Sequence, residues 1–193
     1  MSMWNEALRR AELVAAGAAL ARRGLVRGRE GNLSCRLDQT HLLLTPRGVD
    51  KGRLAATDLV LVDLHGPLPE QASSEAQVHI AVYRACQAVQ ALVHAHPLRV
   101  LALAALGATP SPARLEEGRA LVPMIELVAQ AQPGSAELAA GCARAMQRAP
   151  AAVLAGHGVL CGGTDIWQAL ERVEVVELLA AVALAAAERV VAI

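Results

Sequence analysis

Apolar and polar positions repeat with two different periods along the chain, which predicts a mixture of helices and strands. Apolar side chains at helical spacing, or flanked by capping residues, predict helices at 3–23, from about 74 onwards, 98–106, 135–147 and 165–190. Short apolar runs bounded by turn-forming residues predict strands at 33–37, 41–45, 59–63, 91–96, 121–124, 151–155 and 159–161. The mixture indicates an α/β protein.

The first helix should pack on the rest of the molecule through one face. The positions that share this face at helical spacing are Trp4, Leu8, Ala11, Ala15 and Ala18. Gly24 follows as a helix stop.

Composition narrows the class of protein. The chain has 193 residues, 54% of them hydrophobic, and no repeat or low-complexity linker, so we expect one domain over 1–193. Its 18 basic and 18 acidic residues cancel and aromatic residues make up 2%, which gives no indication of nucleic acid binding. The apolar stretches are too short for a membrane span. Four cysteines without C-x-x-C spacing are typical of free thiols in a cytoplasmic protein.

Two histidines stand one residue apart at the end of the apolar run 91–96. Successive side chains of a strand point to opposite faces, so His94 and His96 would project from the same face. Pro97 cannot continue a strand ladder and should end the strand there. The pair suits two ligands of one metal ion, although H-x-H also occurs by chance.

His157 is the candidate for a third ligand. It lies between two glycines at the end of another predicted strand, so its neighbours leave it uncovered. Three histidines with an open fourth position form a catalytic metal arrangement, with zinc the first choice and other divalent ions possible. Glu75, at the predicted start of a helix, could move a proton beside such an ion. The alternative for Glu75 is a carboxylate that the helix dipole stabilises.

Two turns are candidate anion-binding sites. The first is the glycine-rich stretch before Asn32, and the second is the helix start at Ser73 and Ser74, where Ser74 with Gln77 fits a capping box. Backbone N–H groups in such turns can hold a phosphate. Most turns of this composition are turns only, so neither is diagnostic alone.

Taken together, the motifs resemble a known family. They are G-N-L-S at 31–34, T-P-R-G-V-D-K-G at 45–52, D-L-H-G at 63–66, S-S-E at 73–75, H-A-H-P at 94–97 and G-H-G at 156–158. In this order and with this spacing, they are similar to the class II aldolase/adducin family over most of the chain.

The resemblance implies a fold and a site. The fold is a single three-layer α/β/α domain, with a central, mostly antiparallel sheet flanked by helices, in a homotetramer whose active sites lie at subunit interfaces. His94, His96 and His157 match the metal ligands, and Glu75 matches the catalytic acid/base. The residues that match the phosphate pocket are Asn32, Gly48, Ser73 and Ser74.

The resemblance also implies a reaction. Its aldolases cleave a ketose 1-phosphate, with L-fuculose 1-phosphate the best-known, into dihydroxyacetone phosphate and an aldehyde by a zinc-stabilised enediolate. Glu75 stands where the epimerases carry Asp, which favours an aldolase or a dehydratase, and the 45–54 segment is reminiscent of methylthioribulose 1-phosphate dehydratases. A dehydratase, epimerase or decarboxylase therefore stays open, as does a metal-free interaction module like the adducin head.

Some features depart from the family pattern. Arg29 and Arg47 stand where small or hydroxylated residues are common, and if they face the pocket they favour a carboxylate or a more highly charged substrate. The aldolases use a tyrosine after the H-x-H helix, where this chain has Pro123 and Met124; its only tyrosine is Tyr83. The source of a second proton donor is open.

Overall fold

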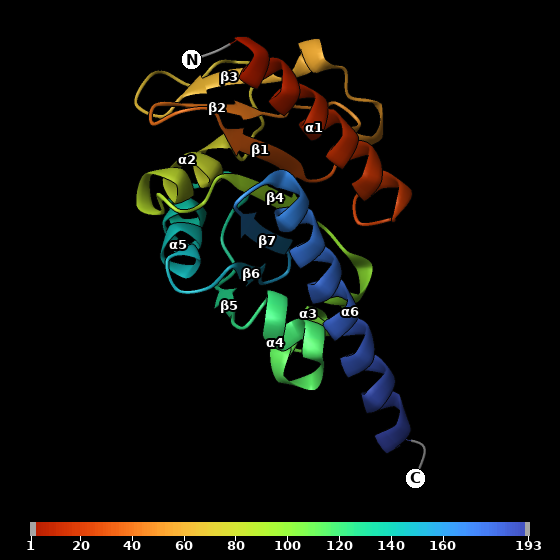
Figure 1. Ribbon diagram of the computed structural model, residues 1–193. Coiled ribbons are helices and arrows are strands. Elements are labelled where there is room, and N and C mark those ends of the chain that lie inside the picture. Colours follow the sequence, from red (N-terminus) through yellow and green to blue (C-terminus); the bar gives the residue numbers. More distant parts are fainter. Residues whose placement is uncertain (1–2, 192–193) are drawn as a thin grey trace.

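A seven-stranded sheet runs through the middle of the molecule in the computed structural model, which describes the backbone of residues 3–191 and the side chains of 6–187 (Figure 1). Its strands are β1 (Asn32–Arg36), β2 (His41–Leu44), β3 (Val60–Asp63), β4 (Ala91–Ala95), β5 (Ile125–Val128), β6 (Ala151–Leu154) and β7 (Gly158–Gly163). They lie in the order β3-β2-β1-β4-β7-β6-β5. Only the β5–β6 pair is parallel, so the expectation of a mostly antiparallel sheet is confirmed.

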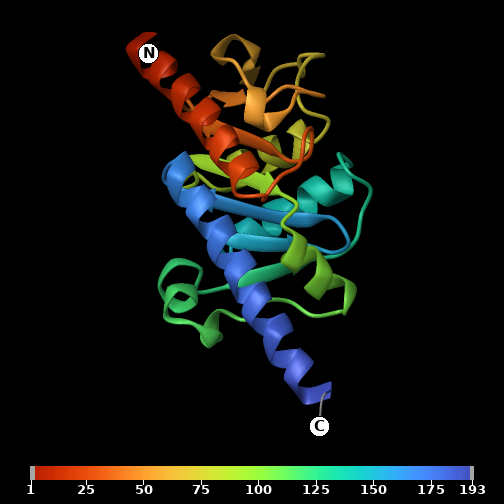
Figure 2. The same cartoon turned by 90° about the vertical axis from the view of Figure 1, so that its right-hand side faces the viewer.

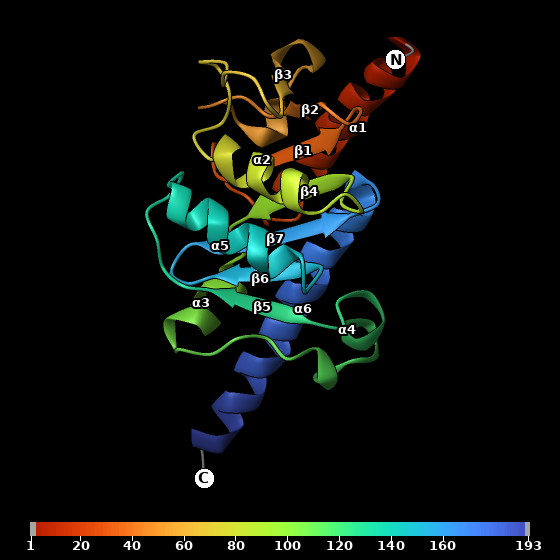
Figure 3. The same cartoon turned by 90° about the vertical axis from the view of Figure 1, so that its left-hand side faces the viewer.

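Helices cover both faces of this sheet. They are α1 (Met3–Arg22), α2 (Ala76–Ala85), α3 (Leu98–Ala105), α4 (Glu116–Leu121), α5 (Ala136–Met146) and α6 (Ile166–Val191), with short 3-10 turns η1 (Lys51–Arg53), η2 (Ala56–Asp58) and η3 (Pro112–Arg114). The long helices α1 and α6 lie on the same side of the sheet (Figure 2), and α2 and α5 lie on the other (Figure 3). The predicted three-layer α/β/α arrangement is therefore confirmed.

The alternation of side chains along β4 divides the core in two. Ala91, Val93 and Ala95 point toward α1 and α6, whereas Leu92 points toward α2 and α5. His94 shares the Leu92 side by the same alternation and is 2% exposed. The central strand thus delivers a histidine to the layer that contains α2.

The face that α1 buries differs from the prediction. The helix packs through Leu13, Ala16, Gly17 and Leu20, whereas Leu8, Ala11 and Ala15 are exposed and Ala18 is half-buried; the side chain of Trp4 lies outside the described residues. Alanine occurs on every side of this helix, so apolar periodicity could not select a face. Close packing decides it, because a Cβ at Gly17 would lie 2.5 Å from the carbonyl oxygen of Lys51 in η1.

The strand predicted at 121–124 was wrong in position. Leu121 ends α4, and the strand is β5, which pairs with β6 in the register Ile125↔Ala151. Pro123 has no N–H to give to a ladder, so the extended pairing begins after it. β5 is an edge strand, and Leu127 on it is 58% exposed.

Three smaller features of the described residues concern the helices, the cysteines and two histidines apart from the site. No helix among residues 3–191 combines the length and the apolar character that a membrane span requires. The four cysteines are all free thiols, as their spacing predicted, and three of them are buried. His41 and His65 lie outside the histidine cluster, with His41 bonded to Asp38 and His65 exposed.

Gly31 provides a test of how tightly β1 and β4 approach. It has φ +68°, and a Cβ there would lie 2.5 Å from the carbonyl oxygen of His94. We expect Gly31→Ala to lower the free energy of unfolding by about 2–5 kcal/mol, because the left-handed backbone and the overpacking both oppose it. Denaturant unfolding at one protein concentration measures this change.

Gly24→Ala is the matched control. Gly24 has φ +69° but nothing within 4 Å of its ideal Cβ. It should cost only the backbone strain, about 1–2 kcal/mol. Equal losses for the two variants would contradict the close approach at Gly31.

Candidate active site

His94 and His96 lie at the point where β4 ends. The strand stops at Ala95, one residue earlier than predicted, and Pro97 caps α3. His94 is buried and pairs across the sheet with Asn32 on one side and Leu160 on the other. Although His96 lies beyond the end of the strand, its ring is close to that of His94, with centroids 4.8 Å apart.

His157 reaches the same place from the neighbouring strands. It lies in the turn between β6 and β7, one residue after Gly156, which has φ +66°. Its ring centroid is 4.7 Å from that of His94 and 5.2 Å from that of His96. A Cβ at Gly158 would crowd the rings of His96 and His94, at 2.9 and 3.2 Å, so a glycine there permits the approach.

The donor set of this cluster fits a divalent cation. One ring nitrogen from each of the three histidines lies within 4.8 Å of the others. His94 Nδ1 donates to the carbonyl oxygen of Val159 at 3.0 Å, so Nε2 is the nitrogen of His94 that faces inward. Burial lowers the pKa of His96 to about 3 and also lowers that of His157, which favours the neutral form that a metal ligand requires.

Two atomic details agree with this fit. The Nε2 atoms of His94 and His96 are 2.9 Å apart, so a proton or a cation must lie between their lone pairs. Among the described residues, His157 Nδ1 is buried without a hydrogen-bond partner. Three imidazole ligands suit zinc first, and iron, copper or nickel also accept them.

Glu75 directs its carboxylate at the histidines and not at its own helix. Its Oε2 lies 3.2 Å from His94 Nε2, and its Oε1 lies 3.2 Å from His157 Nε2. Burial alone would raise the pKa of Glu75, but hydrogen bonds with His94 and Asn32, and the positive charge that His94 and His157 carry when protonated, hold it well below its usual range. The carboxylate is therefore ionised and can accept a proton.

The helix start differs from the predicted capping box. Glu75, not Ser74, is the N-cap of α2, and no side chain caps it. Ser73 Oγ instead accepts from the N–H of Glu75 at 3.3 Å. Because its carboxylate is used by the histidines and Asn32, stabilisation by the helix dipole alone does not account for Glu75.

An open cavity of about 340 Å³ lies in front of this cluster. The residues singled out from the sequence that line it are Arg29, Asn32, Arg47, Gly48, Ser73, Ser74, Glu75, His96 and His157. His94 also belongs to the predicted site, but it lies behind the residues that line the cavity. The structure therefore brings all the predicted site residues to one place, from five separate segments of the chain.

The two arginines stand at the cavity with free guanidinium groups. Arg29 and Arg47 are exposed, and neither has a side-chain hydrogen bond or ion pair to another described residue. Asn32 differs, because its amide is already engaged by Glu75 and His79. Its expected contact with a phosphate would compete with those bonds.

Lys51 is a feature of the site that the sequence did not reveal. It lies in a stretch of mostly polar residues at 49–54, yet it is 1% exposed and lines the cavity. Its Nζ donates to the carbonyl oxygens of Arg29 at 3.1 Å and Val49 at 2.7 Å, and burial lowers its pKa. Lys51 therefore ties together the two turns that carry Arg29 and Arg47.

Tyr83 is not placed as a proton donor in the cavity. It is completely buried on α2, and burial raises the pKa of its hydroxyl. Its hydroxyl is bonded to Ser34 at 2.9 Å. Within the chain, it does not replace the tyrosine that the aldolases use.

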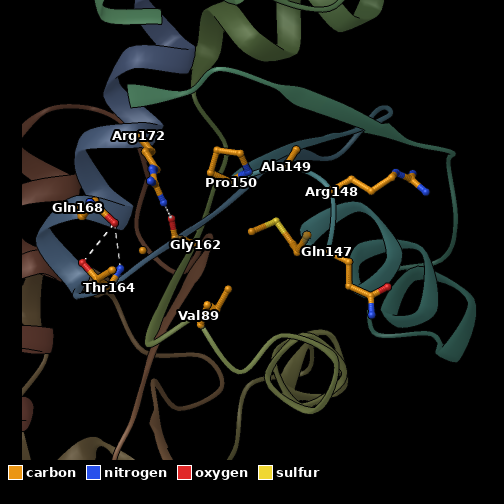
Figure 4. Close-up of a pocket in the computed structure, with 12 residues that line it drawn as sticks. Val89, Gln147, Arg148, Ala149, Pro150, Gly162, Thr164, Gln168 and Arg172 are labelled. Atoms are coloured by element: carbon orange, nitrogen blue, oxygen red, sulfur yellow. Dashed lines mark hydrogen bonds between the residues drawn. The ribbon is translucent and has the colours of Figure 1, made fainter. Parts of the chain in front are cut away.

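A second cavity of about 310 Å³ lies at the opposite end of β7 (Figure 4). Arg172 donates to the carbonyl oxygen of Gly162, and Gln168 accepts from the N–H of Thr164. Arg148 is paired with Glu126. The two arginines of this cavity are thus bonded within the protein, whereas Arg29 and Arg47 at the histidine cavity have no such partner among the described residues.

Comparison with known proteins places the chain among related sequences. Residues 11–184 match the family model described as Class II Aldolase and Adducin N-terminal domain. The chain is 30% identical to the 3-oxo-tetronate 4-phosphate decarboxylase of Haemophilus influenzae, over 86% of this chain and 81% of that one. It is 35% identical to the methylthioribulose-1-phosphate dehydratase of Acidiphilium cryptum, over 90% and 88%.

A solved structure is similar throughout. The L-fuculose-1-phosphate aldolase of Thermus thermophilus superposes with a TM-score of 0.85 at 32% identity, covering 90% of this chain and 91% of that one. Sequence and structure agree over nearly the whole length. The chain belongs to the class II aldolase and adducin family.

Proposed function

We propose that this protein is a metal-dependent lyase that cleaves a small ketose 1-phosphate, of the L-fuculose 1-phosphate type, into dihydroxyacetone phosphate and an aldehyde. The observation that carries the proposal is the Glu75 carboxylate, 3.2 Å from two histidines of the three-histidine cluster, at the inner end of an open cavity. An interaction module like the adducin head has no need of this arrangement.

Each group has a role in this proposal. His94, His96 and His157 would hold Zn²⁺ or another divalent ion, which when bound supplies Lewis-acid polarisation of a substrate oxygen. Glu75 accepts a proton from the substrate and returns one to the carbon freed by cleavage. Ser73, Ser74 and Gly48 would hold the phosphate, with Asn32 at its edge.

The size and charge of the cavity fit a small anionic substrate. Its volume of about 340 Å³ suits a molecule of a few carbon atoms. Arg29 and Arg47, which are exposed at its lining, attract negative charge. We expect a cytoplasmic homotetramer, as the resemblance implies, and Leu98 and Leu106, 59% and 70% exposed, are candidates for a subunit contact.

Decarboxylation of a 3-oxo acid phosphate is a second candidate function. It is favoured by Arg29 and Arg47, whose unpaired guanidiniums line the cavity and suit a carboxylate in addition to a phosphate. The similarity to a 3-oxo-tetronate 4-phosphate decarboxylase supports it.

Dehydration is supported by the T-P-R-G-V-D-K-G segment and the dehydratase relative.

A panel of substrates separates these reactions. Release of dihydroxyacetone phosphate from a ketose 1-phosphate supports the aldolase. Water loss from methylthioribulose 1-phosphate, or carbon dioxide release from a 3-oxo-tetronate 4-phosphate, with no retro-aldol product, would replace it by the dehydratase or the decarboxylase.

Glu75→Gln tests the proton carrier. The variant keeps the shape and the hydrogen bond from Asn32 but cannot accept a proton, so kcat should fall about 10²–10⁴-fold with the metal content unchanged. Glu30→Gln is the control, because Glu30 lines the same cavity but bonds the N–H of Arg27. Near-normal turnover by Glu75→Gln would remove the assigned role.

Arg29→Gln and Arg47→Gln test the second candidate function. If the arginines hold a carboxylate, each should raise KM for a 3-oxo acid phosphate about 10–100-fold, the loss of one charged hydrogen bond, and affect a ketose 1-phosphate less. Arg27→Gln is the control, since Arg27 is exposed on the same turn outside the cavity lining. Steady-state kinetics that match the control would exclude a carboxylate subsite.

A further inference from the structure

A stripe of buried polar side chains runs along β1 on the side that faces α2. Asn32, Ser34 and Arg36 alternate with apolar residues and are 3%, 0% and 8% exposed. Opposite them on α2, at intervals of four residues, stand Glu75, His79 and Tyr83. Four residues of a helix rise about 6 Å and two residues of a strand about 6.6 Å, so the two series stay in register.

The stripe forms a continuous chain of hydrogen bonds, which we call the β1–α2 ladder. Asn32 Nδ2 donates to Glu75 Oε2 at 2.9 Å, and Asn32 Oδ1 is bonded to His79 Nε2. His79 Nδ1 lies 2.6 Å from Ser34 Oγ, which is bonded to the Tyr83 hydroxyl at 2.9 Å. Arg36 closes the ladder by donating to the Tyr83 carbonyl oxygen at 2.6 Å.

The chemistry of the groups fixes the direction of every bond. An ionised Glu75 only accepts, so the NH₂ group of Asn32 must face it. The Asn32 oxygen then needs a donor, which makes His79 the Nε2–H tautomer. The bare Nδ1 of His79 accepts from the Ser34 hydroxyl, and the Ser34 oxygen accepts from Tyr83.

Burial keeps His79 in the form that the ladder requires. The ring is completely buried, and burial, together with the nearby His94, lowers its pKa to about 3 against the opposing charge of Glu75. His79 therefore stays neutral near neutral pH. It does not line the cavity, so its influence on a substrate must act through Asn32.

We propose that His79 is a positioning residue: as its Nε2–H tautomer it orients the Asn32 amide to donate to Glu75 and so keeps that carboxylate directed at His94 and His157. Without this donor, the Asn32 amide can turn its oxygen toward Glu75. Two oxygens would then face each other, and the carboxylate would leave the histidines.

The first test uses the metal-free protein and does not depend on the proposed function. The chain has six histidines, so ring-¹⁵N labelling gives a small set of signals, and the one lost in His79→Gln belongs to His79. Long-range ¹H–¹⁵N spectra should show His79 as the neutral Nε2–H tautomer with Nδ1 unprotonated. An Nδ1–H tautomer would overturn the proposal.

The second test compares two amide substitutions and rests on the proposed function. The Gln amide can occupy the place of Nε2 and still donate to Asn32, whereas the shorter Asn amide reaches only the place of Nδ1, near Ser34. We expect His79→Asn to lower kcat about 10–100-fold with KM little changed, and His79→Gln to stay within about threefold of wild type.

Both variants lose the same ring, so a purely structural role would affect them alike. Thermal unfolding and metal content are measured for each as controls. Equal losses of kcat in His79→Gln and His79→Asn would overturn the proposal. If the wild-type chain acts on none of the phosphates offered, the proposed function fails, whereas the tautomer still decides the role of His79.

Discussion

The β1–α2 ladder is the constraint on which the rest of the site depends. A polar side chain buried on a strand costs stability unless it is hydrogen-bonded, so Asn32, Ser34 and Arg36 fix where α2 lies and in which register. That register places Glu75 at the helix start beside the end of β4. Glu75, the proposed proton carrier, is therefore positioned by backbone geometry and by a buried network.

The order of the strands in the sheet positions the histidines. β4 lies between β1 and β7, so Asn32, His94 and Leu160 stand side by side across the sheet, and the turn before β7 brings His157 to the same edge. Glycines at 31 and 158 allow these backbones to approach closely. The site thus forms where the central strands end, with the arginine-bearing turns in front of it.

Much of this could be predicted from the sequence because it depends on local rules. Period-two alternation at 91–96, a proline stop and a histidine between glycines made the three histidines candidates, and the resemblance to the family joined them into one predicted site. The burial of Lys51 and the face of α1 could not be predicted, because each depends on contacts between segments distant in sequence. The ladder corresponds to a pattern in the sequence, with polar residues at 32, 34 and 36 and at 75, 79 and 83. Pairing these two series requires knowing that the strand and the helix pack together.

We expect a divalent ion to bind His94, His96 and His157 next to Glu75. Anomalous diffraction from crystals of the protein as purified, with elemental analysis of the same sample, measures this binding. One ion per chain should lie within bonding distance of the three imidazoles, and it should be lost from His157→Ala but not from His65→Ala. A protein without stoichiometric metal, or with its ion held elsewhere, would contradict this expectation.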